Sequence, residues 1–100
     1  MRYTVRYLET VRRDREAIKA YLSQYSTTAA MRLFEKIRNK MELVKSNPYM
    51  HKSYEGRPQF RRMVIEDYLI FYKVIETSKT IEVHHIFHGT RDIEQHLAKP

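Results

Sequence analysis

Hydrophobic positions change their spacing twice along the chain. Tyr3, Val5 and Tyr7 alternate with other side chains and predict an opening strand over residues 3–8. Apolar residues then recur at helical spacing, with Thr10 as a candidate cap. The two stripes are Val11, Ile18, Leu22 and Tyr25, and then Ala30, Phe34, Ile37, Met41 and Val44. Because only a short polar break separates them, we expect an antiparallel helical hairpin that ends before Pro48.

The second half of the chain has the pattern of a sheet. Residues 48–58 contain Pro and Gly and predict an exposed loop. Three β-rich runs follow at residues 60–65, 68–75 and 80–87, parted by short turns, and residues 92–97 predict a short terminal helix. The order β, α, α, β, β, β predicts a two-layer α+β fold in which the hairpin covers an antiparallel meander. The pattern leaves the place of the first strand in the sheet open.

Composition narrows the classes of protein. A length of 100 residues indicates one domain, residues 1–100. The absence of cysteine excludes a disulfide framework, a thiolate metal site and a cysteine nucleophile, and it suits a reducing cytoplasm. No apolar stretch approaches the roughly 18 residues of a membrane span. The net charge of +7 favours a polyanion or an acidic protein as partner, while solubility alone remains an alternative.

The histidines near the C-terminus are candidates for chemistry. Strict alternation from Thr80 puts Ile81, Val83, His85 and Phe87 on one face and Glu82, His84, Ile86 and His88 on the other. His84 and His88 then lie roughly 13 Å apart along the strand, too far for shared ligation of one ion. We therefore expect no metal site and no cofactor, and a core position for His85. His88 stands at the strand end near Arg91, where sites are commonly built.

A basic and aromatic segment precedes the meander, comprising Tyr49, His51, Lys52, Tyr54, Arg57, Phe60, Arg61 and Arg62. Its binding surface would be Tyr54, Arg57, Arg61 and Arg62. A solvated loop, a protein partner and single-stranded nucleic acid all fit this composition. RNA cleavage without a metal would need an acid, a base and cations around phosphorus. The candidates for those roles are Tyr54, Glu55, Arg61, Arg62, Tyr72, Lys73, His88 and Arg91.

Two motifs carry a family resemblance. A Tyr-x-Ile-x-Tyr strand spans residues 68–72, and the last predicted strand closes with His88, Gly89, Thr90, Arg91 and Asp92, an H-G-x-R-D-like signature. With the opening strand and the long hairpin, the sequence resembles the RelE/ParE superfamily of toxins from bacterial toxin–antitoxin operons.

The resemblance implies a small basic toxin that a cognate proteic antitoxin neutralises. RelE-like members cut mRNA in the ribosomal A site, whereas ParE-like members poison DNA gyrase. The closing signature and the hairpin favour a ParE-like gyrase inhibitor, which is not an enzyme. The alternative is a ribonuclease that uses Lys52, Arg61, Tyr72, His88 and Arg91. A third alternative is a homologue that binds its antitoxin without being toxic.

Overall fold

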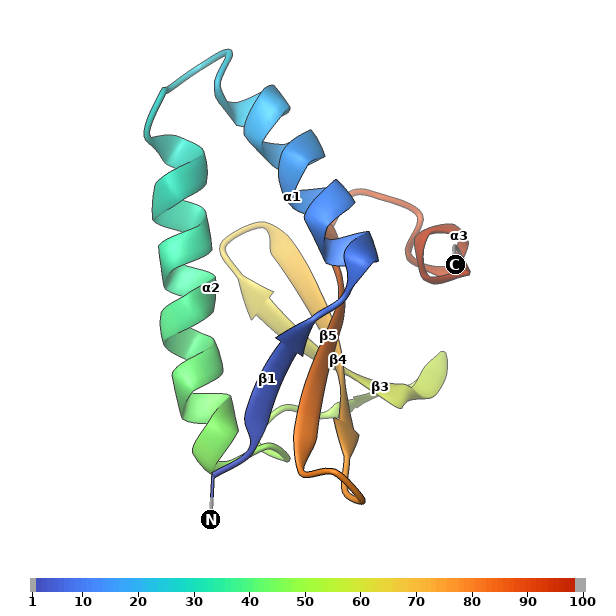
Figure 1. Cartoon of the computed structure of the whole chain (residues 1–100). Helices are drawn as coiled ribbons and strands as arrows, with labels where there is room; N and C mark the ends of the chain where they lie inside the picture. The colour runs from blue at the N-terminus through green and yellow to red at the C-terminus, as the bar shows by residue number, and fades with distance from the viewer. Residues whose placement is uncertain (1, 99–100) are drawn as a thin grey trace.

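The computed structural model describes residues 2–98 and confirms the expected α+β architecture (Figure 1). Its elements, in chain order, are β1 (Thr4–Tyr7), α1 (Glu9–Leu22), α2 (Ala29–Ser46), β2 (Ser53–Tyr54), β3 (Arg57–Ile65), β4 (Tyr68–Ile75), β5 (Thr80–His88) and α3 (Ile93–Leu97). The described helices include none that is long and apolar enough to cross a membrane.

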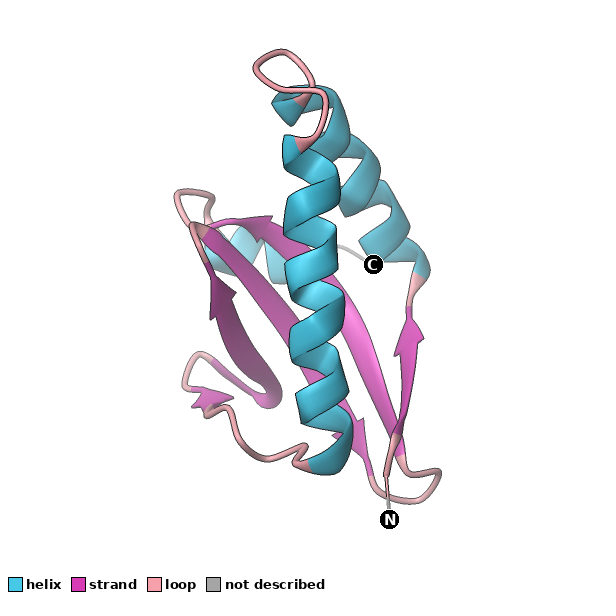
Figure 2. Ribbon diagram, turned by 90° about the vertical axis from the view of Figure 1, so that its left-hand side faces the viewer, coloured by secondary structure: helices cyan, strands magenta, loops and turns pink. Residues whose placement is uncertain are grey.

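One twisted sheet carries the fold, with strand order β1-β5-β4-β3-β2. Strands β3, β4 and β5 form the expected antiparallel meander, and β1 pairs parallel with β5. The hairpin of α1 and α2 lies against one face of the sheet, and α3 lies on the other side (Figures 1 and 2). The parallel pairing is possible because the hairpin supplies the crossover from β1 to the rest of the sheet.

Apolar residues form a core on each face of the sheet. The larger core lies under the hairpin and contains Val11, Ile18, Leu33, Ile37, Met41, Val44, Met63, Ile65, Tyr68, Ile70, Tyr72, Ile81, Val83 and Ile86. The smaller core contains Phe60, Leu69, Phe71, Phe87 and Leu97. Strand β4 contributes to both, so its nearly continuous apolar sequence matches a strand covered on two faces.

A β-bulge in β5 overturns the strict alternation that the sequence predicts. Phe71 pairs with His85 and Tyr72 pairs with Val83, so His84 is an extra residue on β5. The expected faces are therefore wrong beyond Val83. Ile86 joins the larger core and Phe87 the smaller one. His84 and His85, expected on opposite faces, both contact the ring of Phe60, with ring centroids 5.3 and 6.0 Å away.

The helix ends also differ from expectation. Leu8 occupies the cap position of α1 and makes no side-chain cap bond, while the Thr10 hydroxyl donates to the His84 carbonyl. Thr10 is thus a tertiary contact and not a helix cap. Helix α1 ends at Leu22, which leaves Tyr25 72% exposed in the connection to α2.

Helix α2 is rotated slightly from the position that its apolar stripe suggests. Leu33 is buried among the core residues, whereas Phe34 is half-buried and only packs against the core's edge. The guanidinium of Arg15 lies 4.9 Å from the centroid of the Phe34 ring. This cation–π contact stabilises an aromatic side chain that remains partly in solvent.

The segment 48–58 is not simply an exposed loop. It contains β2, and β3 begins at Arg57, three residues before the expected start. Pro48 is buried, and its carbonyl accepts a hydrogen bond from the Tyr72 hydroxyl at 2.9 Å. This buried bond fixes the chain where α2 leads into the sheet.

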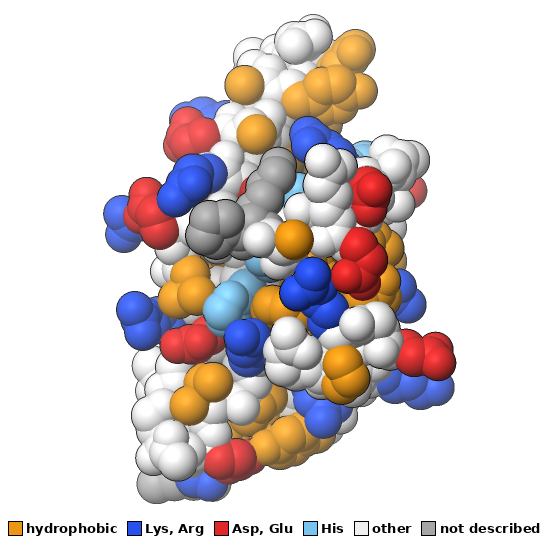
Figure 3. All heavy atoms as spheres, turned by 90° about the vertical axis from the view of Figure 1, so that its right-hand side faces the viewer, with side chains coloured by type: hydrophobic (Ala, Val, Ile, Leu, Met, Phe, Trp, Pro, Cys, Tyr) orange, Lys and Arg blue, Asp and Glu red, His pale blue; other side chains and the backbone are white. Residues whose placement is uncertain are grey.

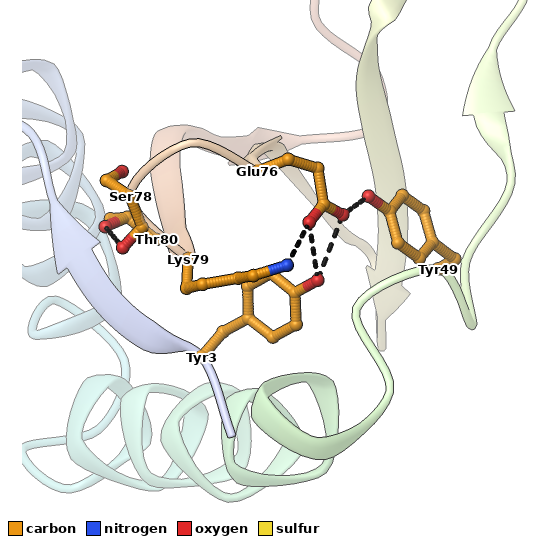
Figure 4. A network of polar contacts seen from close by, with 6 residues as sticks. All are labelled: Tyr3, Tyr49, Glu76, Ser78, Lys79 and Thr80. Atoms are coloured by element: carbon orange, nitrogen blue, oxygen red, sulfur yellow. Dashed lines mark hydrogen bonds and ion pairs between the residues drawn. The ribbon is translucent and has the colours of Figure 1, made fainter. Parts of the chain in front are cut away.

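A polar network fastens β1 beside the turn between β4 and β5 (Figure 4). The Tyr3 hydroxyl donates to the Glu76 carboxylate at 2.9 Å, and Lys79 lies 2.8 Å from the same carboxylate. Tyr49, from the segment after α2, donates to Glu76 as well. The hydrogen bonds that Glu76 makes with Lys79 and Tyr3 lower the pKa of its carboxyl group below the ordinary value. Three segments far apart in the sequence therefore meet at one acidic side chain.

Candidate functional site

Strand β1 pairs with only the first part of β5, and helix α1 covers the rest of that strand edge. The β1 pairing ends where Tyr7 meets Val83. Beyond that point the Thr10 hydroxyl bonds the His84 carbonyl, and Asp14 Oδ2 accepts the Ile86 N–H at 2.9 Å. Side chains of α1 thus satisfy backbone groups that would otherwise need another strand.

Asp14 also connects this edge to the C-terminal helix. Its Oδ1 lies 3.1 Å from Nε2 of His96, and both side chains are about one-tenth exposed. The His96 ring packs on Phe87 with a centroid separation of 4.1 Å. It also stands 5.4 Å from the His85 ring, nearly perpendicular to it. Residues of α1, β5 and α3 therefore converge on one polar cluster.

His85 is the most deeply buried histidine of this cluster, with 3% of its surface exposed. Burial lowers the pKa of His85 to about 4, and the neighbouring His96 and His84 lower it further in the same direction. The ring is therefore neutral at neutral pH. Its expected core position is confirmed, although it faces the smaller core through the bulge.

A cleft of about 520 Å³ opens beside this cluster, between α1, β5 and the connection to α3. Its basic, acidic and histidine lining residues are Arg13, Asp14, His85, His88, Arg91 and His96. Within residues 2–98, the side chains grouped closely enough to hold a metal ion are Asp14, His85 and His96. The cleft therefore combines cations, groups that can transfer protons, and side chains of the types that can bind a metal.

A shallower hollow lies between the first residues of α1 and the sheet face that carries the smaller core. Its lining includes Arg13, Arg57, Lys73, His84 and His85. Figure 3 shows this side of the molecule, with histidine side chains near its middle and Lys and Arg side chains around them. Burial lowers the pKa of His84, and its hydrogen bond to Glu82 at 3.2 Å opposes that effect. The hollow presents the positive charge that a polyanion would contact.

Two of the proposed ribonuclease residues have structural contacts. Tyr72 is fully buried, and burial raises its pKa to about 12. Arg61 donates from Nη1 to the His51 carbonyl at 2.7 Å. Its guanidinium carbon also stands 4.7 Å from the centroid of the Tyr49 ring. Both side chains therefore hold the segment that follows α2.

The other three ribonuclease candidates occupy two places. Lys52 is exposed and precedes Ser53, which pairs with Arg61. On β4, His88 pairs with Tyr68 and Arg61 pairs with Tyr72. These two β4 residues are four positions, or about 13 Å, apart along the strand. Arg91 follows His88 beyond the strand. The structure thus brings Lys52 near Arg61 and His88 near Arg91, and it does not bring the two pairs together.

The H-G-T-R-D signature forms the connection from β5 to α3. Nδ1 of His88 lies 2.8 Å from the Thr90 hydroxyl, and the Gly89 N–H donates to the Asp67 carbonyl at 2.8 Å. The Arg91 N–H closes a turn on the His88 carbonyl at 3.0 Å. Asp92 caps α3 by accepting the Gln95 N–H. These contacts position α3 against the sheet.

The proposed basic and aromatic surface is divided by the sheet. The guanidinium of Arg62 lies 5.5 Å from the Tyr54 ring, which packs on Phe71 in the smaller core. Arg57 pairs with Glu94 of α3 at 3.0 Å on the same side. Arg61 instead pairs across the ladder with Tyr72 of the larger core. Tyr54, Arg57 and Arg62 therefore form one surface without Arg61.

Sequence reasoning missed Asp14 and His96. A signal for Asp14 was present, because it stands between Val11 and Ile18 on the apolar stripe of the first helix. A carboxylate on an apolar stripe indicates a buried polar partner. His96 lies three residues after Ile93 on the same short helix. Neither residue indicates by itself that the other is its partner, 82 positions away.

Solved structures with this arrangement of elements define the class of the protein. The toxin of the chromosomal ParDE system of P. aeruginosa superposes with a TM-score of 0.69 at 16% identity, over 86% of this chain and 95% of that chain. The isolated E. coli RelE toxin superposes with a TM-score of 0.64 at 17% identity, over 96% of this chain and 94% of that chain. A chain of the RelBE2 toxin–antitoxin complex of Mycobacterium tuberculosis superposes with a TM-score of 0.59 at 16% identity, over 88% of this chain and 99% of that chain. The chain therefore has the RelE/ParE fold.

Sequence comparison narrows the class to a family. Residues 5–93 match the family described as ParE toxin of type II toxin-antitoxin system, parDE. The chain belongs to this ParE toxin family. A comparison with curated protein sequences gives no match.

Proposed function

We propose that this protein is a toxin that a cognate antitoxin neutralises and that inhibits DNA gyrase by binding to it. Family membership supports the first part, together with complexes such as the intact E. coli RelBE toxin–antitoxin complex, whose toxin shares the fold. The positive net charge of +7 suits an acidic protein partner. The second part rests on the surface of the chain.

The observation that carries a protein target is an apolar patch at the tip of the helical hairpin. Tyr21, Tyr25 and Met31 are 53%, 72% and 72% exposed. The two tyrosine rings touch edge to face at 5.4 Å. The tip extends beyond the sheet, and apolar side chains gather there (Figures 2 and 3). Exposed aromatic and methionine side chains are enriched at protein interfaces, so this tip, which we call the hairpin patch, suits a protein target.

The distribution of the ribonuclease candidates also supports binding over cleavage. General acid–base cleavage needs the acid, the base and the cations within hydrogen-bond reach of one phosphate. Arg61 and His88 pair with β4 residues that are four positions apart, Tyr72 and Tyr68, and Tyr72 is buried. The five residues cannot reach one phosphate in this arrangement.

Cleavage of mRNA remains the second candidate because of the shallower hollow beside the start of α1. Arg57, Lys73, His84 and His85 line that hollow. They could contact a phosphate and transfer a proton there. Of these four residues, the sequence suggested only Lys73 as a candidate for RNA cleavage.

Two assays on the purified chain separate the candidates: inhibition of plasmid supercoiling by gyrase, and cleavage of mRNA on programmed ribosomes. We expect supercoiling to stop while the mRNA stays intact. The double variant Tyr25→Ser/Met31→Ser should weaken gyrase inhibition at least about tenfold, because it removes the exposed apolar contacts. Leu43→Ser is the matched control, since Leu43 is 54% exposed on the same hairpin but far from its tip.

The opposite result has a definite meaning. Ribosome-dependent cleavage without gyrase inhibition would overturn the gyrase proposal, and His84→Gln would then show whether the hollow is the catalytic site. Equal inhibition by the double variant and the Leu43 control would exclude the hairpin patch as the gyrase contact.

A further inference from the structure

Three potential metal ligands converge at the wall of the cleft. Asp14 comes from α1, His85 from β5 and His96 from α3, and one ligand atom of each lies within 4.8 Å of the other two. Tyr21 of the hairpin patch lines the same cleft, but the proposed gyrase contact uses none of the three ligand residues. Its geometry therefore has to be explained separately.

The donor set suits a divalent transition metal. Imidazole nitrogen and carboxylate oxygen are common ligands of Zn²⁺, and three protein ligands leave a further position for water. In a tetrahedral site with bonds of about 2 Å, ligand atoms lie about 3.3 Å apart. Asp14 and His96 are already 3.1 Å apart. The longest separation would need to close by about 1.5 Å at most, within the reach of side-chain rotation.

His85 provides a second, independent observation. The residue is 3% exposed, and its Nδ1 atom is buried without a hydrogen-bond partner among the described residues. A buried polar atom without a partner is unfavourable, and such atoms in native structures often mark an ion or a water. The neutral imidazole has a lone pair available for a cation.

The surroundings of Asp14 resemble the supporting shell of a metal site. The Ile86 N–H donates to Oδ2 at 2.9 Å and holds the carboxylate with Oδ1 towards His96. Outer hydrogen bonds of this kind orient metal ligands. All three ligand residues line the cleft of about 520 Å³, so an ion could reach them from solvent.

We propose that Asp14, His85 and His96 together bind one divalent transition-metal ion of the Zn²⁺ type. The ion links α3 to α1 and β5. A helix of five residues is too short to be stable alone, so its position depends on tertiary contacts of this kind. The site is thus a structural clamp on the C-terminal segment.

Calorimetric titration of the full chain with Zn²⁺, free of any affinity tag and of chelator, tests the proposal. We expect one equivalent to bind with a dissociation constant of about 1 μM or tighter. Asp14→Asn and His96→Gln should each weaken binding at least about tenfold, because each removes a ligand. Both variants preserve size and hydrogen-bonding capacity, so one remains informative if the other does not fold. His84→Gln, adjacent to His85 but outside the cluster, is the matched control and should bind as the parent does.

Limited proteolysis gives a second readout. Arg91 is exposed between β5 and α3, so trypsin cleavage after it reports on the clamp. Zn²⁺ should slow this cleavage in the parent and in His84→Gln, and not in His96→Gln. The proposal is overturned if binding is weaker than about 100 μM, or if Asp14→Asn and His96→Gln both bind as tightly as the parent.

Discussion

Tyr72 shows how one buried side chain acquires its role from contacts that its sequence position does not reveal. It stands in a β-rich run with apolar neighbours, where its hydroxyl suggested chemistry. The structure buries the ring completely and directs the hydroxyl to the Pro48 carbonyl. Burial raises the pKa of Tyr72 from 10.0 to about 12, because the ionised phenolate would lose its solvation.

This shift predicts how stability depends on alkaline pH. The folded pKa is raised, so the stabilisation is complete below the unfolded pKa of 10.0 and is lost as the pH rises to about 12. The difference between the folded and unfolded pKa values of Tyr72 corresponds to a loss of at most about 3 kcal/mol of unfolding free energy. Tyr72→Phe should therefore lose less unfolding free energy than the parent across this window. It should also be about 1 kcal/mol less stable at neutral pH, because the Pro48 carbonyl loses its donor.

Urea denaturation at several pH values measures these stabilities, and the tyrosinate absorbance of parent minus variant isolates the titration of Tyr72. If that difference titrates near pH 10.0, the ordinary value for tyrosine, the phenol is solvated and the prediction is wrong.

Among the elements, β5 and α1 depend on each other through the bulge at His84. The bulge turns Ile86 and Phe87 to the faces that each core requires. The extra residue exposes a carbonyl at the strand edge, and Thr10 of α1 donates to it. A helix side chain therefore stabilises an irregularity in a strand more than 70 residues away.

Removing the Thr10 hydroxyl tests this dependence. Thr10→Val keeps the shape of the side chain and loses the donor, so the His84 carbonyl remains partly buried without a partner. We expect the free energy of unfolding to fall by about 1 to 3 kcal/mol in urea denaturation. Thr10→Ser keeps the hydroxyl and should stay within about 0.5 kcal/mol of the parent. If both variants lost the same stability, the effect would come from the γ-methyl group and not from the hydrogen bond.

For the whole molecule, the balance of charges matters more than any single ion pair. Most of the described ion pairs, such as Arg2 with Glu42, are exposed and contribute little stability. The net charge of +7 is instead a long-range property that accelerates the approach of an acidic partner. The proposed antitoxin complex should reflect this.

Salt should therefore slow the association of the chain with its antitoxin. Raising NaCl from about 50 to 500 mM should lower the association rate constant about tenfold or more, because screening shortens the range of the attraction. The dissociation rate constant should change much less, since short-range apolar contacts dominate it. Stopped-flow fluorescence measures both constants. An association rate independent of salt would show that the net charge has no role in assembly.

The sequence by itself determined the local features of this protein. The apolar periods specified the hairpin, the meander and the terminal helix, because amphipathic spacing follows directly from helix and strand geometry. The Tyr-x-Ile-x-Tyr and H-G-T-R-D motifs indicated the family, to which the matched residues 5–93 assign the chain. The carboxylate of Asp14 on an apolar stripe was a signal of a buried partner, but the sequence reading did not use it.

Tertiary structure alone decided which residues meet. The parallel pairing of β1 with β5, the bulge at His84 and the convergence of Asp14, His85 and His96 all depend on contacts between distant segments. The sequence pattern of one strand cannot specify a bulge. A regular and a bulged strand can share the same pattern of side chains until pairing with the neighbouring strand fixes the register. The ribonuclease candidates were chosen by residue type, which does not determine which side chains meet after folding. In the folded sheet they lie in separate places.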